Sequence, residues 1–331
     1  MSKSRKKIFI TGGAGYVGAV LVPKLLSSGY SVTVYDLMIF GEEVLSPHDS
    51  LTVIKGDIRD YEKLSTHIKN HDVVVHLACI SNDPSFDLNP ELGKSINLDS
   101  FRPLVEVSRN SGIKRFIYAS SSSVYGIKKE TDVHEGMTLE PLTDYSKYKA
   151  ECEAILAGYQ GTDFTTVTIR PATVCGYSPR QRLDVVVNIL TNLAWNKREI
   201  TVFGGEQLRP NLHIEDMAEA YMALIEASDE SVAGNVFNYG CENHTVQQLA
   251  EIVKKEVGDD VRLRNVKTDD NRSYHISSKK AENMLGLKAK RPIRQAVVDL
   301  CHAFNAERLP DSLNSKKYFN IQIIKDWDSK I

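Results

Sequence analysis

The chain has 331 residues, of which 42% are hydrophobic and 25% are charged, and its formal net charge is −2. This composition is typical of a globular protein with one large domain or a domain and a smaller lobe, and it gives no indication of a nucleic-acid or membrane surface. No apolar run approaches the roughly 20 residues that span a bilayer, and no apolar signal-peptide core is present. The five cysteines are scattered without a Cys-x-x-Cys pair, which predicts reduced thiols, a cytoplasmic location and no metal site.

Short apolar runs alternate with helical patterns in the first half of the chain. Strands are predicted at residues 7–11, 31–35, 51–54, 73–77, 115–119 and 164–170, and helices at 16–28, 60–69, 91–111 and 144–159. The alternation, with near-continuous Val and Ile runs such as 73–75, predicts an α/β fold. Its parallel sheet is doubly wound, with helices on both faces.

The regular alternation of strands and helices ends at about residue 176. Helices are predicted at 183–197, 215–229, 245–257, 277–285 and 293–308, and strands only at 200–203, 235–239 and 262–266. This pattern predicts a smaller mixed lobe, interleaved with returns to the large sheet. The last twenty residues are polar and aromatic, and we expect them to pack as an irregular tail.

A glycine-rich turn, Thr-Gly-Gly-Ala-Gly-Tyr-Val-Gly at residues 11–18, directly follows the first strand and opens a helix. Gly12 permits a tight turn, Gly15 lets the backbone approach a pyrophosphate, and Gly18 lets helix and strand pack closely. The helix N-terminus adds unpaired N–H groups and the positive end of a dipole. The context therefore favours a dinucleotide site over an ordinary glycine-rich turn.

Two aspartates end the next two strands. Asp36 lies eighteen residues after Gly18, where an acid accepts both ribose hydroxyls of the adenosine and repels a 2′-phosphate. No arginine follows within residues 37–41, so NAD is predicted rather than NADP. Asp57, in Gly56-Asp57-Ile58, is placed to take the adenine amino group; a turn aspartate is the competing interpretation.

Tyr145 and Lys149 are spaced by one helical turn, in the stretch Asp-Tyr-Ser-Lys-Tyr-Lys at residues 144–149. On a helix the two side chains lie on the same face. A nearby cation favours phenolate and lowers the pKa of a tyrosine, which predicts an acid–base group usable at neutral pH. By itself the spacing also fits a solvated helix face.

These motifs, in this order, resemble the extended short-chain dehydrogenase/reductase family, in particular its NAD-dependent nucleotide-sugar epimerase/dehydratase group. The matching elements are residues 11–18, 56–58, 76–78 (His-Leu-Ala), 120–126 (Ser-Ser-Ser-Ser-Val-Tyr-Gly), Tyr145 with Lys149, 170–174 (Arg-Pro-Ala-Thr-Val), and Arg209 with His213 and Asp216. The resemblance extends to about residue 290.

The resemblance implies a Rossmann-type NAD-binding domain at residues 1–176, with later returns near 212–240, and a lobe at 177–331 that holds a nucleotide-diphosphate sugar. It implies a catalytic Ser/Thr at Ser121, counted back from Val-Tyr-Gly, with neighbouring serines as alternatives. The implied cofactor contacts are Gly12, Gly15, Tyr16, Val17, Gly18, Asp36, Leu37, Asp57, Ile58, Leu77, Ala78, Tyr145, Lys149, Pro171 and Val174.

The family also implies a division of labour. NAD⁺ takes hydride from a sugar carbon while Tyr145 removes the hydroxyl proton. Lys149 holds the nicotinamide ribose and, with the charge of the cofactor, lowers the pKa of Tyr145. Ser121 donates to the oxygen that becomes a carbonyl.

The chain departs from well-known members in two places. Dehydratases that act at C4 and C6 carry Asp and Glu at the positions of Ser122 and Ser123, and hydroxyls cannot replace those carboxylates in expelling water. Thr173 stands where relatives often carry Asn. Residues 173–184 resemble a branch that acts on surface-polysaccharide sugars, including nucleotide-linked heptoses.

Substrate contacts are expected from several polar side chains. Arg209 and Arg272 match positions that clamp the substrate diphosphate, for which a bidentate guanidinium is suited; surface salt bridges are the alternative. Ser81 and Asn82 follow the fourth strand, where they could read sugar hydroxyls or cap a turn. The predicted substrate set is completed by Ser122, Ser123, Thr173 and Asn188.

The predicted function is an NAD-dependent epimerase on a nucleotide-diphosphate sugar, acting at C4 through a keto sugar. The alternative is a net NAD(P)-dependent oxidoreductase, a dehydrogenase or ketoreductase, on a nucleotide-linked sugar or heptose. A 4,6-dehydratase, a threonine-oxidising enzyme and a noncatalytic NAD-binding protein are less favoured. A homodimer is expected, through a four-helix bundle formed by helices near 98–111 and 145–158; no nucleic-acid or membrane partner is expected.

Overall fold

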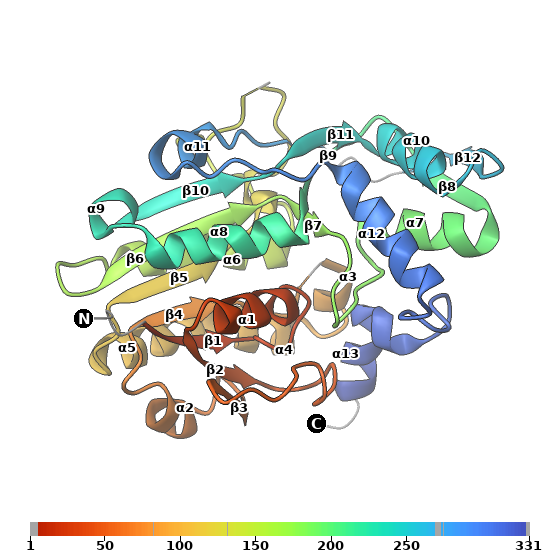
Figure 1. Ribbon diagram of the computed structural model, residues 1–331. Coiled ribbons are helices and arrows are strands. Elements are labelled where there is room, and N and C mark those ends of the chain that lie inside the picture. The colour runs from red at the N-terminus through yellow and green to blue at the C-terminus, as the bar shows by residue number, and fades with distance from the viewer. Residues whose placement is uncertain (1–5, 82, 131, 269–272, 274, 329–331) are drawn as a thin grey trace.

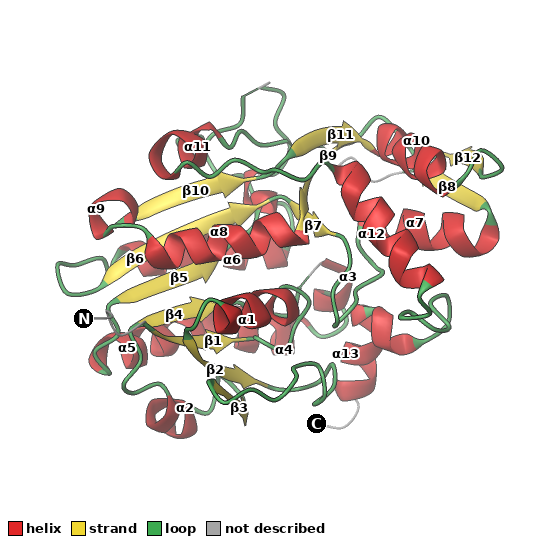
Figure 2. Cartoon of the chain, in the orientation of Figure 1, coloured by secondary structure: helices red, strands yellow, loops and turns green. Residues whose placement is uncertain are grey.

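The computed structural model describes residues 6–81, 83–130, 132–268, 273 and 275–328 (Figures 1 and 2). Asn82 and Arg272, two of the predicted substrate residues, lie outside these ranges. The strands are β1 (Lys7–Thr11), β2 (Ser31–Asp36), β3 (Leu51–Lys55), β4 (Val73–His76), β5 (Arg115–Ala119), β6 (Thr165–Pro171), β7 (Thr173–Cys175), β8 (Glu199–Phe203), β9 (Leu208–His213), β10 (Asn235–Tyr239), β11 (Glu242–Thr245) and β12 (Arg262–Val266).

Helices alternate with these strands. The α-helices are α1 (Gly18–Ser27), α2 (Tyr61–His67), α3 (Asp83–Phe86), α4 (Pro90–Lys94), α5 (Phe101–Asn110), α6 (Asp144–Ala157), α7 (Val186–Lys197), α8 (Ile214–Glu226), α9 (Asp229–Val232), α10 (Val246–Val257), α11 (Lys279–Leu285), α12 (Ile293–Asn305) and α13 (Asn320–Asp328). A π-helical turn η1 (Ser95–Asp99) and the 3₁₀ turns η2 (Ser122–Tyr125) and η3 (Lys316–Tyr318) complete the set.

The large sheet has the strand order β10-β6-β5-β4-β1-β2-β3, and every neighbouring pair in it is parallel. This confirms the predicted doubly wound, Rossmann-type fold. The chain builds outward from β1 to β3 and then returns to place β4 on the other side of β1. Ligands of such sheets bind at the carboxyl ends of the strands beside this reversal.

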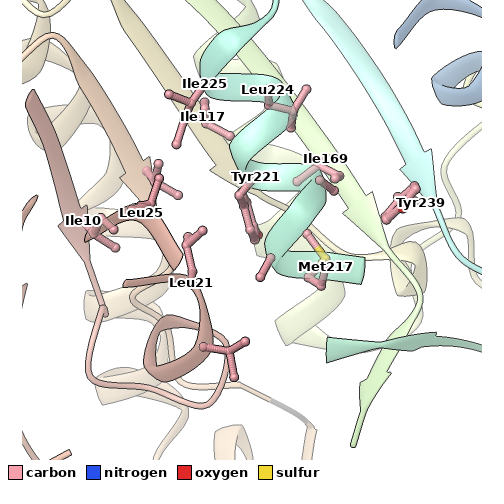
Figure 3. Packing of buried hydrophobic residues seen from close by; sticks show 14 of the residues in the cluster. Ile10, Leu21, Leu25, Ile117, Ile169, Met217, Tyr221, Leu224, Ile225 and Tyr239 are labelled. Atoms are coloured by element: carbon pink, nitrogen blue, oxygen red, sulfur yellow. The ribbon is translucent and has the colours of Figure 1, made fainter. Parts of the chain in front are cut away.

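Helices cover both faces of the sheet. On one face Leu21 of α1 and Tyr221 of α8 pack over Ile10, Ile117 and Ile169 of the strands (Figure 3). On the opposite face α2, α5 and α6 supply a second apolar cluster. All four residues of β4 are buried, which is why that strand reads as a continuous apolar run rather than an alternating one.

The smaller lobe is built on two short sheets, β11-β9-β7 and β12-β8, with α7, α10 and α12 packed around a separate apolar cluster. The helix α8 and the strand β10 belong to the large sheet and its covering layer (Figure 1). Both lie within the predicted returns near 212–240, and the domain boundary at residue 176 stays a prediction.

Three predictions about secondary structure were wrong. The helix expected at 91–111 is interrupted by η1, since Pro103 lacks an N–H and its ring would crowd the carbonyl of residue 99 in a regular helix. The strands β7, β9 and β11 were not predicted, because polar residues and Pro210 hide any alternation. The tail is ordered as η3 and α13 rather than irregular.

The C-terminal helix α13 returns to the large lobe and packs against α3 (Figure 1). Trp327 of α13 packs against the apolar cluster on the face of the sheet that α2, α5 and α6 cover. Asn89 Nδ2 donates to Asp328 Oδ1 at 2.9 Å. Within the described residues, no helix is long and apolar enough to cross a membrane.

Candidate active site

A pocket of about 510 Å³ lies between the carboxyl ends of the central strands and the smaller lobe. Its wall includes the glycine-rich turn, the loop after β4, the serine run after β5, the first two turns of α6 and the segment before α7. A volume of this size suits a cofactor and part of a substrate. The pocket lies beside the point where the order of the sheet reverses, as the fold leads one to expect.

The glycines of the turn have different surroundings. Gly12 has a φ of +75°, and a Cβ there would lie 2.5 Å from the backbone N of Ala78. A Cβ on Gly18 would lie 2.2 Å from the carbonyl oxygen of Gly13. A Cβ on Gly15 would meet only the carbonyl oxygen of Gly12, at 3.2 Å, and Gly15 borders the pocket. Gly12 and Gly18 are thus required by packing, whereas Gly15 leaves room for a ligand.

Replacing Gly15 by alanine is therefore expected to weaken NAD binding by at least about tenfold, or about 1.4 kcal/mol. The free energy of unfolding should change by less than about 1 kcal/mol, since the added methyl group would meet only the Gly12 carbonyl oxygen, at 3.2 Å. Calorimetric titration and urea denaturation measure the two effects. Gly158→Ala, at the end of α6, is the control, and wild-type affinity in Gly15→Ala would contradict the predicted path of the dinucleotide.

Asp36 lines the pocket at the end of β2. Its carboxylate accepts hydrogen bonds from the backbone N–H of Ala14 at 3.0 Å and of Met38 at 2.8 Å. Burial raises the pKa of this carboxyl, and the two N–H donors oppose the rise. Asp36 therefore stabilises the glycine-rich turn, and its contact with the adenosine ribose stays a prediction. The predicted cofactor residues Tyr16, Val17, Leu37, Ile58, Leu77, Ala78, Pro171 and Val174 also line the pocket.

Asp57 has a partner within the chain, and its predicted contact with the adenine stays a prediction. Its carboxylate pairs with the guanidinium of Arg59 at 2.5 Å and accepts from the backbone N–H of Arg59 at 2.8 Å. Its neighbours Gly56 and Ile58 line the pocket, but Asp57 does not. The competing interpretation, a turn aspartate, fits the structure.

Ser121, Tyr145 and Lys149 line the same pocket. Thr143 caps α6 in a reciprocal capping box with Ser146, which fixes the first turn that carries Tyr145. Lys149 Nζ donates to the carbonyl oxygen of Ala119 at 2.7 Å and lies 5.8 Å from the centre of the Tyr145 ring. The structure thus brings together the three side chains that the resemblance names as catalytic.

The predicted lowering of the Tyr145 pKa does not arise from the side chains of the chain itself. Burial raises the pKa of Tyr145 well above its usual value, and nearby Cys79 and Asp83 add to the rise. Arg182 and a hydrogen bond with Ser121 oppose it. Sequence spacing shows that Lys149 is near, but it does not show how deeply the phenol is buried, and burial dominates.

The alternative catalytic serines can be compared directly. Ser121 Oγ lies 2.9 Å from Ser123 Oγ and hydrogen-bonds with Tyr145. Ser120 Oγ instead donates to the buried carboxylate of Glu153. The geometry therefore favours Ser121 over Ser120 as the partner of Tyr145.

A buried polar network connects α6 to the strands of the large sheet. The Arg170 guanidinium pairs with Glu153 at 2.6 Å, with both side chains less than a tenth exposed. Arg170 also donates to the Tyr125 hydroxyl at 2.7 Å, and that hydroxyl donates to Asn238 Oδ1 at 2.8 Å. The network joins α6 to β6 and β10 and so fixes the helix that carries Tyr145 and Lys149.

His76 lies beneath Lys149 at the end of β4 and hydrogen-bonds with Thr11 Oγ1 at 2.7 Å. Burial, and secondarily the Lys149 charge, lower the pKa of His76 to about 3. The imidazole is therefore neutral at physiological pH and adds no positive charge beside Lys149. His76 stacks on Tyr118, whose ring centre lies 5.0 Å from Lys149 Nζ.

The predicted substrate residues divide into three groups. Ser81, Ser122, Ser123, Thr173 and Arg209 line the pocket. Asn82 and Arg272 lie outside the described residues. Asn188 is a correction, because it is fully buried away from the pocket: its amide donates to the Tyr16 hydroxyl at 2.9 Å and to the Arg182 carbonyl at 2.7 Å, and accepts from the Gly176 N–H.

In the predicted motif of Arg209, His213 and Asp216, two of the three residues have structural roles. His213 caps α8 by accepting from the backbone N–H of Glu215 at 3.1 Å. Asp216 is buried, accepts from the backbone N–H of Lys290 and of Arg291, and pairs with the Arg291 guanidinium. Of this motif, only Arg209 reaches the pocket.

Sequence reasoning missed several pocket residues, notably Arg180, Arg182, Asn320 and Trp327. Arg182 Nε donates to Asp184 Oδ1 at 2.5 Å, and its Nη1 donates to Ser81 Oγ at 3.2 Å. The available signal in the sequence was the pair of arginines within residues 173–184, the segment that resembles one branch of the family. Asn320 and Trp327 gave none, because their position depends on how the tail folds back.

Comparison with known proteins agrees with this geometry. A model of the NAD dependent epimerase/dehydratase family matches residues 8–240. UDP-glucose 4-epimerase of Lactobacillus helveticus is 26% identical over 86% of this chain and 92% of its own length. UDP-glucuronic acid decarboxylase 1 of Xenopus tropicalis is 27% identical over 92% of this chain and 73% of its own.

Solved structures show the same relationship. The crystal structure of UDP-glucose 4-epimerase from Thermotoga maritima with UDP-glucose is 25% identical, with a TM-score of 0.81 over 91% of this chain and 99% of that one. The glycine-rich turn leaves room for a ligand at Gly15, and Asp36 lines the same pocket at the end of β2. The chain therefore belongs to the NAD-dependent epimerase/dehydratase family, and it is an enzyme whose cofactor is NAD.

Proposed function

We propose that the protein is an epimerase that inverts C4 of a nucleotide-diphosphate sugar through a transient keto sugar, with NAD regenerated in each cycle. The observation that carries the proposal is one pocket lined by the glycine-rich turn, Ser121, Tyr145 and Lys149, with hydroxyls at Ser122 and Ser123. The similarity to relatives named UDP-glucose 4-epimerase supports the same reaction.

The proposed roles follow from where each side chain lies. Tyr145 Oη removes the proton of the sugar hydroxyl and later returns it, and Ser121 hydrogen-bonds to the oxygen that becomes the carbonyl. We assign to Lys149, whose Nζ donates to the Ala119 carbonyl, the binding of the nicotinamide ribose. Bound NAD⁺ supplies the hydride acceptor and a positive charge, which favours the phenolate form of Tyr145 against the effect of burial.

Loss of water is disfavoured at this site. Ser122 and Ser123 line the pocket where the family's dehydratases present carboxylates, and a hydroxyl neither donates nor accepts a proton readily near neutral pH. Oxidation and reduction need only the groups around Tyr145. The pocket therefore supports epimerisation better than 4,6-dehydration.

A net NAD(P)-dependent oxidoreductase on a nucleotide-linked sugar or heptose is the second candidate. Thr173 lines the pocket from β7 with a hydroxyl where relatives often present an amide, so the sugar that this pocket accepts is open. Arg209 also lines the pocket and is our candidate for binding the substrate diphosphate. Both features suit either reaction, so the fate of the cofactor has to distinguish the two.

The two candidates predict different fates for NAD. Heat denaturation of the purified epimerase should release tightly bound NAD(H), and UDP-, GDP-, dTDP- or CDP-linked sugars should be tested for an epimer formed without net NADH. Chromatography of the sugar products identifies the carbon that is inverted. A protein purified without nucleotide that reduces added NAD in proportion to substrate would overturn the epimerase proposal in favour of the oxidoreductase.

Assembly and location are inferred from helices and thiols. The helices α5 and α6 pack against each other on one side of the sheet, and we infer a homodimer through these helices. Sedimentation of a monomer at micromolar concentration would contradict it.

All five cysteines are unpaired, which supports the cytoplasmic location that we infer. Fractionation that recovers the protein outside the cytoplasm would contradict that inference.

A further inference from the structure

Arg180 is a buried arginine in the wall of the pocket. Its side chain is 4% exposed, and its Nε has no hydrogen-bond partner. Among the described residues, no carboxylate lies within ion-pairing distance of its guanidinium, whose hydrogen bond is to the amide oxygen of Asn320 at 2.5 Å. A buried cation without a counter-charge is costly, so an anionic ligand would stabilise this arrangement.

The segment that carries Arg180 is fastened to the glycine-rich turn. Ser178 Oγ donates to the backbone carbonyl of Tyr16 at 2.8 Å. The Tyr16 hydroxyl donates to the backbone carbonyl of Gly176 at 2.6 Å. These contacts hold residues 176–180 beside the turn on which the family binds the diphosphate of its dinucleotide.

The C-terminal helix fixes the Arg180 side chain. Asn320, the first residue of α13, is 3% exposed; its Nδ2 donates to Ser81 Oγ at 3.0 Å and its backbone N–H donates to Asp184 at 2.9 Å. On the other side, the guanidinium lies 3.5 Å from the centre of the Phe40 ring. Asn320 lies beyond residues 8–240, which the family model matches, so this support comes from the chain's own tail.

The nearby acids are occupied elsewhere. Asp36 accepts from the backbone N–H groups of Ala14 and Met38, and Asp184 accepts from Arg182 and from Asn320. Burial lowers the pKa of Arg180 to about 9, with Arg182 lowering it further and Asp184, Tyr16 and Asp36 raising it. The guanidinium therefore remains charged at neutral pH and can bind a phosphate oxygen.

We propose that Arg180, held in place by Asn320 of α13, binds the diphosphate of the NAD cofactor. The inference rests on the use of NAD by this enzyme and is independent of the sugar that it converts. A 2′-phosphate is the other phosphate that an arginine near Asp36 could bind. The fastening of residues 176–180 to the glycine-rich turn favours the diphosphate.

The test compares ligands that differ in their phosphates. Nucleotide-free wild type and the Arg180→Met variant are titrated calorimetrically with adenosine, ADP, NAD⁺ and NADP⁺. The affinity of Arg180→Met for ADP and NAD⁺ should fall at least about tenfold, as expected for the loss of a charge-assisted hydrogen bond, whereas that for adenosine should be unchanged. Arg180→Lys should recover part of the loss.

Arg308→Met is the matched control, because Arg308 is an exposed arginine 5.8 Å from the ring centre of Tyr177 and does not line the pocket. Wild-type affinity of folded Arg180→Met for ADP and NAD⁺ would overturn the inference. If the affinity for adenosine fell as much as that for ADP, the inference would be overturned in favour of a purely structural role of Arg180. If only the affinity for NADP⁺ fell, the contact would be with a 2′-phosphate instead. If wild type itself failed to bind NAD⁺, the cofactor assignment would fail instead.

A second variant tests the role of Asn320 in positioning Arg180. Asn320→Asp keeps the size of the side chain but places a carboxylate against Arg180, which would compete with phosphate. ADP and NAD⁺ should bind more weakly with adenosine unaffected, while Asn314→Asp, the same change at an exposed position of the tail, should bind like wild type. Unchanged ADP affinity in Asn320→Asp would contradict the proposed pairing.

Discussion

Replacing Tyr145 by phenylalanine is expected to lower kcat about a thousandfold while NAD stays bound. The change removes one oxygen, the proposed proton acceptor and donor, and general acid–base groups contribute about 10²- to 10⁴-fold to turnover. The glycine-rich turn and Lys149 are untouched, so the cofactor site should be intact. Turnover of the active nucleotide sugar, and NAD released on heating, measure the two outcomes.

Tyr148→Phe is the matched control for this variant. Tyr148 lies one turn along α6 from Tyr145 and packs against Phe86 with ring centres 5.6 Å apart, outside the pocket lining. Its turnover should stay within a few-fold of wild type. Wild-type turnover by Tyr145→Phe would refute the proposed acid–base role.

The pH profile gives an independent measure of Tyr145. Burial raises the pKa of its phenol, and in our proposal the charge of bound NAD⁺ opposes that rise. The phenolate fraction grows as pH rises toward the resulting pKa. The wild-type kcat/KM should therefore increase with pH through the neutral and mildly alkaline range. A flat profile in that range would show that proton removal by Tyr145 does not limit the reaction.

Glu153→Gln is expected to lower the free energy of unfolding by about 3–5 kcal/mol, the usual cost of removing one partner of a buried ion pair. The Glu153 and Arg170 side chains are 7% and 5% exposed and lie 2.6 Å apart, so the Arg170 charge would be left uncompensated. Urea denaturation measures the loss. The linked shift of α6 should also reduce turnover, since Lys149 and Glu153 are one turn apart on that helix.

Glu42→Gln is the control for an ion pair in water. Glu42 pairs with Lys55 at 2.5 Å, with both side chains about two-thirds exposed, and its loss should leave the free energy of unfolding close to that of wild type. The double change of Glu153 and Arg170 to methionine removes both charges and should recover part of the stability. A loss below about 1 kcal/mol in Glu153→Gln would mean that the Arg170 charge is not isolated from water.

Local patterns were sufficient for the sheet and for the glycine-rich turn. The bounds of β1, β5, β10 and β12 agree with the predicted ranges, because strand periodicity and the turns that bound it are set by neighbouring residues. Gly12 and Gly18 were predicted for the same reason. The pairing of Asp57 with Arg59 is equally local, because the two residues are two positions apart.

Predictions that depended on contacts with residues distant in the sequence were less accurate. The spacing of Tyr145 and Lys149 correctly brings both to one pocket, but the direction of the Tyr145 pKa is set by burial among residues from several elements. Asn188 is polar and close to the site in sequence, yet its amide is used to hold Tyr16 and residues 176–182. Whether a polar side chain faces a ligand or the interior is decided by its partners.

By itself, then, the sequence determined the doubly wound sheet, the NAD-binding turn and the proposed catalytic Ser121, Tyr145 and Lys149, since these depend on patterns within a few residues. Only the tertiary structure decided how the rest of the pocket is closed. Arg180 and Asn320 are 140 residues apart, and their meeting depends on α13 folding back against the large lobe. No local pattern encodes such a contact, because it results from packing elements that are distant in the chain.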